Sequence, residues 1–440
     1  MHYLSRIGFF FFCLVVLHLG TGDFFALALQ SWHQKIQSEW GGHIKSAGSV
    51  SRPDDESSFQ LVGTGTYYDG NANLRLKNKT FFSEWGYIDT HYELVVSGGD
   101  TWEKTKELKR FYPNLAEIFF AADSTLNDKR RLLNLTGTIA ENDEYILYHR
   151  LDRLSLNLQP RWGTLHLGRQ ALTWGNGLLF NPMDLFNPFA PTDIDRDYKV
   201  GDDMAVFQFN LGSVGEFQLL YVPRRNTESN NVTWDQSSLA AKLHFASGTT
   251  EFDIMAAGHY QDEVIGVGST GYLWNAAWRL DATYTFLETS SNQEGFFSLV
   301  ANMDYSWVWW GKNLYGLLEF YFNDLGSHRY SAALTDPNIS ERLARGEMFT
   351  LGRAYLSGEV RIEAHPLVNV YLTLINNVAD PSGLIIPRAT WDMKENIQFT
   401  LGANVSYGRS GTEFGGFRIS QTEFLYEPVD NAFFWMTYFF

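Results

Sequence analysis

The sequence contains very little cysteine. Among its 440 residues the single cysteine is Cys13, which lies in the apolar segment near the N-terminus. The rest of the chain therefore has no thiol, which excludes disulfides, thiolate metal sites, c-type haem attachment and a cysteine nucleophile. Cys13 directly follows a run of four phenylalanines, residues 9–12, so the small residue that precedes an acylated lipoprotein cysteine is absent.

Long apolar runs and enzyme motifs are also missing. Beyond residue 28 no segment approaches the ~18 apolar residues of a membrane-spanning helix. The sequence has no nucleophile elbow, Walker loop, zincin motif or haem motif, so we predict neither an enzyme nor a cofactor. The formal net charge of −16 argues against nucleic acid as a partner. No linker, repeat or change in composition divides the chain, which predicts a single domain.

Residues 1–28 have the form of a secretory signal. Arg6 supplies a positive charge, residues 7–19 are almost entirely apolar, and Ala26-Leu27-Ala28 offers a cleavage site. We expect cleavage after about Ala28 and a mature domain of residues 29–440.

Aromatic residues are abundant, at 16% of the chain, although the mean hydropathy is only −0.22. Residues 431–440 show why both values occur together, because alternate positions of this stretch form two faces of an extended strand. One face carries Ala432, Phe434, Met436, Tyr438 and Phe440, and the other carries Phe433, Trp435, Thr437 and Phe439. This pattern predicts the closing strand of a transmembrane β-barrel. The ending resembles the C-terminal signature of bacterial outer-membrane proteins, which implies that the barrel-assembly machinery recognises Phe440.

The same period of two recurs along the chain and predicts an all-β, antiparallel transmembrane barrel of about 18 strands, with 16 as the alternative. The expected strands are 42–52, 71–80, 85–96, 147–158, 163–171, 203–211, 215–223, 236–246, 250–259, 265–273, 277–287, 296–309, 314–324, 349–362, 368–378, 384–392, 396–407 and 431–440. A helical turn is expected near Trp102–Phe111. Short connections alternate with mostly longer ones, and an even strand number with both termini in the periplasm places the short set there.

The polar faces of the strands supply the candidate pore lining, which mixes both signs of charge. The candidates are Arg75, Lys77, Lys79, Asp89, Glu93, Arg153, Arg279, Asp281, Arg353, Glu359, Arg361 and Arg388. Such groups can form a transverse field in a water-filled pore, or they can pair across strands and merely fill the interior. Arg75, Lys77 and Lys79 form a local basic ladder, which is a candidate contact for an anion.

The connection 172–202 is irregular yet partly apolar, with three prolines and two phenylalanines after Asn181. An apolar irregular segment favours burial, so we expect it to fold into the lumen as a constriction; capping the rim is the alternative. The motif and constriction candidates are Arg169, Gln170, Trp174 and Asp184. Strict alternation puts Arg169 on the lipid face, unless a bulge near Gly168 redirects it or it lies at the rim.

Three aspartates in this connection, Asp193, Asp195 and Asp197, have oxygen ligands suited to Ca²⁺. They lack the glycine and the terminal glutamate of an EF-hand loop, so a solvated acidic loop is the preferred interpretation. No metal site is predicted elsewhere.

Several short motifs between Asp152 and Arg225 resemble a group of porin-like outer-membrane proteins of Gram-negative bacteria. They are Gly168-Arg169-Gln170, Trp174-Gly175-Asn176-Gly177, Asn181-Pro182-Met183-Asp184 and Gly201-Asp202-Asp203-Met204. The first two together are also distantly similar to alginate-export-type barrels. The resemblance implies a barrel in the outer membrane, in contact with lipid and lipopolysaccharide, but it names no ligand. A homo-oligomer fits the resemblance, because trimers are common among porins.

Three functions remain open from the sequence. The preferred one is a channel for passive diffusion of small polar solutes. The alternatives are an export pore for an exopolysaccharide or oligosaccharide, and a barrel that transports nothing and serves as a membrane enzyme or a structural surface protein.

Overall fold

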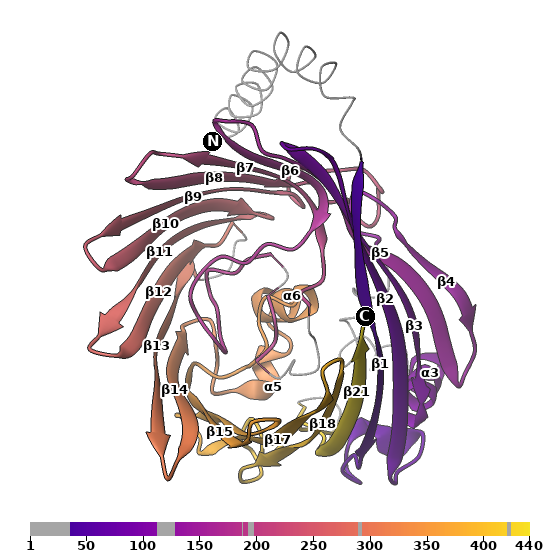
Figure 1. Cartoon of the computed structure of the whole chain (residues 1–440). Coiled ribbons are helices and arrows are strands. Elements are labelled where there is room, and N and C mark those ends of the chain that lie inside the picture. The colour runs from indigo at the N-terminus through magenta and orange to yellow at the C-terminus, as the bar shows by residue number, and fades with distance from the viewer. Residues whose placement is uncertain (1–35, 112–127, 187, 192–197, 289–292, 420–423) are drawn as a thin grey trace.

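The computed structural model describes residues 36–111, 128–186, 188–191, 198–288, 293–419 and 424–440; the expected signal sequence lies outside them. Nineteen strands form one antiparallel sheet that closes on itself (Figure 1). The strands are β1 (Gln37–Ser51), β2 (Tyr67–Ser83), β3 (Gly86–Gly99), β4 (Thr136–Glu141), β5 (Tyr145–Leu158), β6 (Gly163–Gln170), β7 (Asp202–Asn210), β8 (Gly215–Val222), β9 (Ser238–Ser247), β10 (Thr250–His259), β11 (Asp262–Leu273), β12 (Ala276–Phe286), β13 (Gly295–Trp309), β14 (Lys312–Asn323), β15 (Ala354–His365), β16 (Val368–Asn377), β17 (Ser382–Lys394), β18 (Ile397–Tyr407) and β21 (Asn431–Phe439).

All of these strands except β4 form the barrel wall, which gives the eighteen-strand ring that the sequence predicts. Each wall strand pairs with its neighbour along the chain, and β3 pairs directly with β5. The ring closes between β21 and β1, from His43 opposite Phe439 to Ser51 opposite Asn431. The short strand β4 pairs with the first half of β5, where β6 no longer reaches.

The two ends of the barrel differ as the sequence predicts. At one end, here called the turn end, lie Phe440 and the short connections between strands. At the other, called the loop end, lie longer segments such as 171–201 and 324–353, together with two short connections near 260–261 and 378–381. The expected helical turn is present as α3 (Asp100–Phe111), at the loop end.

The outer surface of the barrel is apolar. Leu318 on β14 is 59% exposed and Leu372 on β16 is 51% exposed, although both lie in the middle of their strands. Around the turn end a set of exposed tryptophans includes Trp40, Trp274 and Trp310. A closed barrel with an apolar belt and an aromatic girdle is the architecture of an integral outer-membrane protein. Among the described residues no helix is long and apolar enough to span a bilayer.

The barrel interior is partly filled from the loop end. The described residues of segment 171–201 and the segment carrying α5 (Tyr330–Ala333) and α6 (Pro337–Arg345) lie inside the ring (Figure 1). The periodicity of the sequence does not predict β4, either of these helices, the 3-10 turn at Ser58–Leu61, or β19 (Phe417–Arg418) with β20 (Leu425–Tyr426). A local signal for α6 is present, because Asp336 caps its N-terminus, Pro337 opens it and Gly346 ends it with φ of 71°.

Candidate functional site

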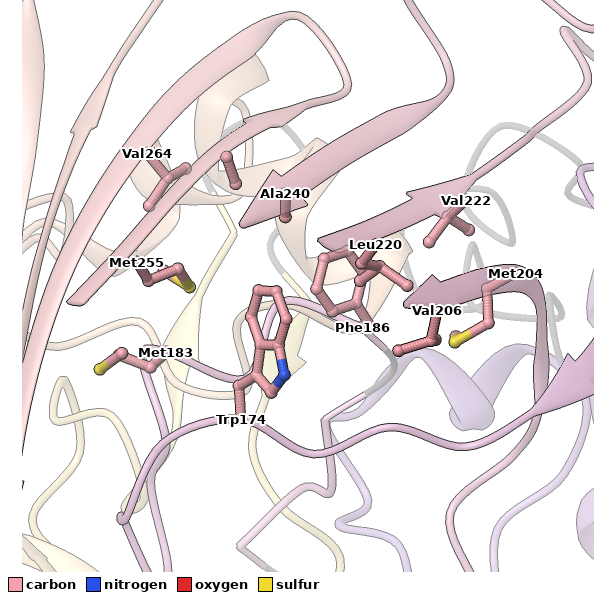
Figure 2. Close-up of a cluster of buried hydrophobic side chains, with 11 residues drawn as sticks. Trp174, Met183, Phe186, Met204, Val206, Leu220, Val222, Ala240, Met255 and Val264 are labelled. Carbon is pink, nitrogen blue, oxygen red and sulfur yellow. The ribbon is translucent and has the colours of Figure 1, made fainter. Parts of the chain in front are cut away.

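The inner wall formed by β7 to β11 carries a cluster of apolar side chains that is covered by segment 171–201. Figure 2 shows Trp174, Met183 and Phe186 of this segment packed against inward side chains of the wall. Those wall side chains are Met204, Val206, Leu220, Val222, Ala240, Met255, Ala257 and Val264. Trp174 is almost fully buried, its ring meets Phe186 edge-to-face, and its Nε1 donates to Gln218 on β8 at 2.8 Å. Burial of this much apolar surface holds the segment inside the lumen.

A second set of contacts anchors the same segment to another part of the wall. The backbone amides of Leu178, Leu179 and Phe180 donate to the Glu319 carboxylate on β14, at 2.8, 3.0 and 2.7 Å. The ring of Phe180 stacks on Tyr321 of the same strand, with centroids 4.4 Å apart.

Asp281 on β12 makes an equivalent anchor nearby. It accepts from the backbone amide of Asn176 and from the Asn176 side chain at 2.8 Å. The segment is thus fixed both to the β7–β11 wall and to the β12–β14 wall. The expected infolding is confirmed, and the alternative of a loop that only caps the rim is wrong.

A buried ion pair joins two parts of the segment. Lys199 Nζ lies 2.5 and 2.7 Å from the two carboxylate oxygens of Asp184, and both side chains are buried. Burial raises the pKa of Asp184 to about 6, against the opposing effect of Lys199. Burial likewise lowers the pKa of Lys199.

The raised pKa of Asp184 predicts a pH dependence of stability. The folded chain binds the Asp184 proton more tightly than the unfolded chain does. The free energy of unfolding that this protonation adds is therefore complete below pH 3.8 and is lost as the pH rises through about 6. In Asp184→Asn that part of the dependence should disappear. Urea unfolding in detergent at several pH values between 4 and 7 measures it, and identical pH profiles for both proteins would contradict the assignment.

One member of the basic ladder Arg75, Lys77 and Lys79 belongs to a buried cluster of ion pairs. Arg75 is 1% exposed; it pairs with Glu93 on β3 and lies 2.7 Å from Asp152 on β5. Asp152 reaches this cluster because the β3–β5 register shifts beside it, so that Asp152 and its neighbour Arg153 both lie buried, paired with each other at 2.6 Å. These charges neutralise one another, which agrees with the expectation that lumen charges pair across strands.

Segment 171–201 also contacts this wall, through Tyr198. Lys77 donates to the Tyr198 hydroxyl at 2.5 Å, and the guanidinium of Arg75 lies 4.3 Å from the centre of its ring. Lys79 lies over Tyr87, at 4.1 Å from the ring centre. Lys77 and Lys79 are only half-buried, so they are the members of the ladder that remain accessible.

The other candidates are spread over separate parts of the lumen. Asp89 pairs with His91 at 3.2 Å, Arg279 pairs with Asp304 at 2.6 Å, and Glu359 lies 4.0 Å from Arg388.

Two arginines are the most exposed of the candidates. Arg361 lies over the ring of Tyr315, and Arg353 is at the loop end, 3.8 Å from Asp324. The structure therefore does not gather the twelve candidates into one site. Their role in lining a pore stays a prediction.

Arg169 of the motif is buried in a cluster of charges. The register of β6 with β5 and with β7 continues without a shift, so no bulge redirects this side chain. It lies at the loop end of β6, 2% exposed, and binds Asp203 at 2.9 Å and Asp128 at 3.1 Å. Of the two explanations that the sequence allows, the position at the rim is therefore correct. Gln170, the next residue, pairs with Asp202 in register.

The weak calcium candidates Asp193, Asp195 and Asp197 lie outside the described residues. Within the described part of the chain, no group of three or more histidine, aspartate or glutamate side chains is arranged to hold a metal ion.

No protein-family model and no curated protein matches this sequence. Solved structures do match it. Pseudomonas aeruginosa OccK5 (OpdH) aligns with a TM-score of 0.51 and 8% identity, covering 92% of this chain and 98% of its own. P. aeruginosa OccK3 (OpdO) and Acinetobacter baumannii OccAB3 both align with a TM-score of 0.49, at 7% and 8% identity, covering 95% and 92% of this chain and 99% of their own chains. The likeness to OccK5 shows that this chain has the fold of Gram-negative outer-membrane porins.

Proposed function

We propose that the protein is an outer-membrane channel through which small polar solutes diffuse passively, narrowed by segment 171–201. The observation that carries the proposal is the way this segment is held. The carboxylates of Glu319 and Asp281, which belong to the wall, accept hydrogen bonds from the segment. An apolar part of the wall packs against the segment's side chains. A segment so firmly anchored inside a barrel is a fixed constriction, which sets the size of what passes.

The charges that remain accessible support diffusion of polar solutes. Arg279 with Asp304, Arg388 with Glu359, and Arg361 lie on the inner faces of β12 to β17 and are half-buried or exposed. Groups of both signs at the wall retain water and favour hydrated solutes over apolar ones.

Single-channel recording in planar bilayers tests the proposal. The purified barrel is expected to give discrete, stable current steps, because a constriction held by buried contacts does not open and close freely. The complete absence of current from correctly folded protein would overturn the proposal and favour a barrel that transports nothing.

A further inference from the structure

A cavity of about 410 Å³ lies on the inner wall at the loop end, among residues of β18, β21, β1 and β2. These four strands are neighbours in the ring (Figure 1). The size of the cavity falls within the range of small-molecule sites, which is about 300–1,000 Å³. None of the contacts that anchor segment 171–201 to β7–β14 uses the residues that line this cavity. The cavity is therefore separate from the contacts that hold segment 171–201 in place.

Aromatic rings form one side of the cavity. Phe433 and Trp435 alternate on the inward face of β21, with ring centroids 5.3 Å apart and planes within 13° of parallel. Phe433 lies over Gly402 of β18, where an added Cβ would come within 2.5 Å of its ring. The neighbouring strand therefore lets this ring lie flat against the wall.

Amide and hydroxyl groups supply most of the polar part of the lining, beside apolar residues such as Pro53, Phe59 and Val429. Asn404 donates to Asn431 at 3.1 Å, and the side-chain oxygen of Asn404 has no hydrogen-bond partner among the described residues. Asn71 lies exposed on β2. Asp69, the one charged residue among the described residues that line the cavity, already accepts from the amide and hydroxyl of Thr101 at 2.9 and 2.6 Å.

We propose that this cavity binds an uncharged sugar ring of monosaccharide size. Such a ring has an apolar C–H face, which suits a flat aromatic surface, and a rim of hydroxyls, which suits amides that donate and accept hydrogen bonds. A charged ligand finds no free counter-ion in the lining. The inference rests on the proposed channel function and names the class of solute that the channel takes up first.

The test compares two residues of one strand. Glucose, added on the loop-end side, is expected to reduce the current through the wild-type channel reversibly. Phe433→Ala should weaken this block by a factor of roughly three to ten, which is the loss expected for one aromatic contact. Met436→Ala is the matched control, because Met436 lies on the same strand but faces outward, is 49% exposed and does not line the cavity; the block of this variant by glucose should equal that of the wild type. Asn404→Ala, which keeps both rings, should also weaken the block and serves if Phe433→Ala does not fold.

Glucuronate is the matched ligand, because it differs from glucose by one carboxylate. Weaker block by glucuronate supports the uncharged site, whereas stronger block would place the effect at the lysines deeper in the lumen and overturn it. A channel that conducts but shows neither block nor heat of glucose binding in calorimetry would reject the sugar site alone. Absence of current would reject the channel, and calorimetry on the same detergent-solubilised protein would still decide whether glucose binds.

Discussion

Replacing residues 178–198 with a short glycine–serine linker is expected to raise the single-channel conductance severalfold. The replacement removes the Leu178–Phe180 amides that bind Glu319 and the Phe186 ring that covers the β7–β11 wall. The eighteen-strand wall needs none of these residues for its ladders, so the barrel should still close. Planar-bilayer recordings of both proteins at one salt concentration measure the change.

A second deletion controls for shortening a loop. Residues 227–231 lie exposed between β8 and β9, and their removal should leave the conductance unchanged. Equal conductance of the wild type and the 178–198 replacement would show that segment 171–201 does not limit the current.

Arg75→Met is expected to lower the free energy of unfolding by about 1.5–3 kcal/mol, because the buried carboxylates of Glu93 and Asp152 lose their shared partner and keep only Arg150 and Arg153 respectively. Arg361→Met removes the same charge from the lumen, but Arg361 is exposed and its loss should cost about 1 kcal/mol or less. Urea unfolding in detergent gives both values.

The same two variants separate structure from conduction. Arg361→Met should shift the ion selectivity of the channel more than Arg75→Met does, because an exposed charge acts on passing ions and a neutralised buried charge does not. Equal loss of stability in both variants would contradict the division of the lumen charges into buried and accessible groups.

The strands were predictable because lipid imposes a pattern on them. Every second residue of a wall strand faces the bilayer, and Leu372 and Leu374 on β16 illustrate how regularly apolar residues return. All eighteen expected strands overlap strands of the ring. The strand β4 was missed because it is short and its partner β5 already reads as an ordinary wall strand.

The filling of the lumen was less predictable, because it depends on contacts between distant segments. A signal existed on β7, where Met204 and Val206 are apolar on the inward face although Ala205 and Phe207 are apolar on the outward face. A strand that is apolar on both sides must be covered on both sides. The sequence does not say which segment provides the cover.

The charge pairs were unpredictable for a different reason. Alternation assigns Asp152 and Arg153 to opposite faces, yet the register shift between β3 and β5 buries both together beside Arg75. The shift inverts the alternation along β5, so that Ile146 and Tyr148 face inward before it and Ser155 and Asn157 after it, but this inversion does not show which charged side chains meet. The sequence therefore indicates which residues are charged and where they lie along the barrel, but not which of them neutralise each other.

The pairing of β1 with β21 has a consequence for the order in which the barrel assembles. Every other ladder of the ring joins strands that are near neighbours in the chain, so hairpins can form one after another with little loss of loop entropy. This seam joins Gly42 to Phe440, with mutual backbone hydrogen bonds of 2.9 and 3.1 Å. It can form only when nearly the whole polypeptide is in place, so until that moment β1 and β21 present two unpaired edges that must be shielded from other chains.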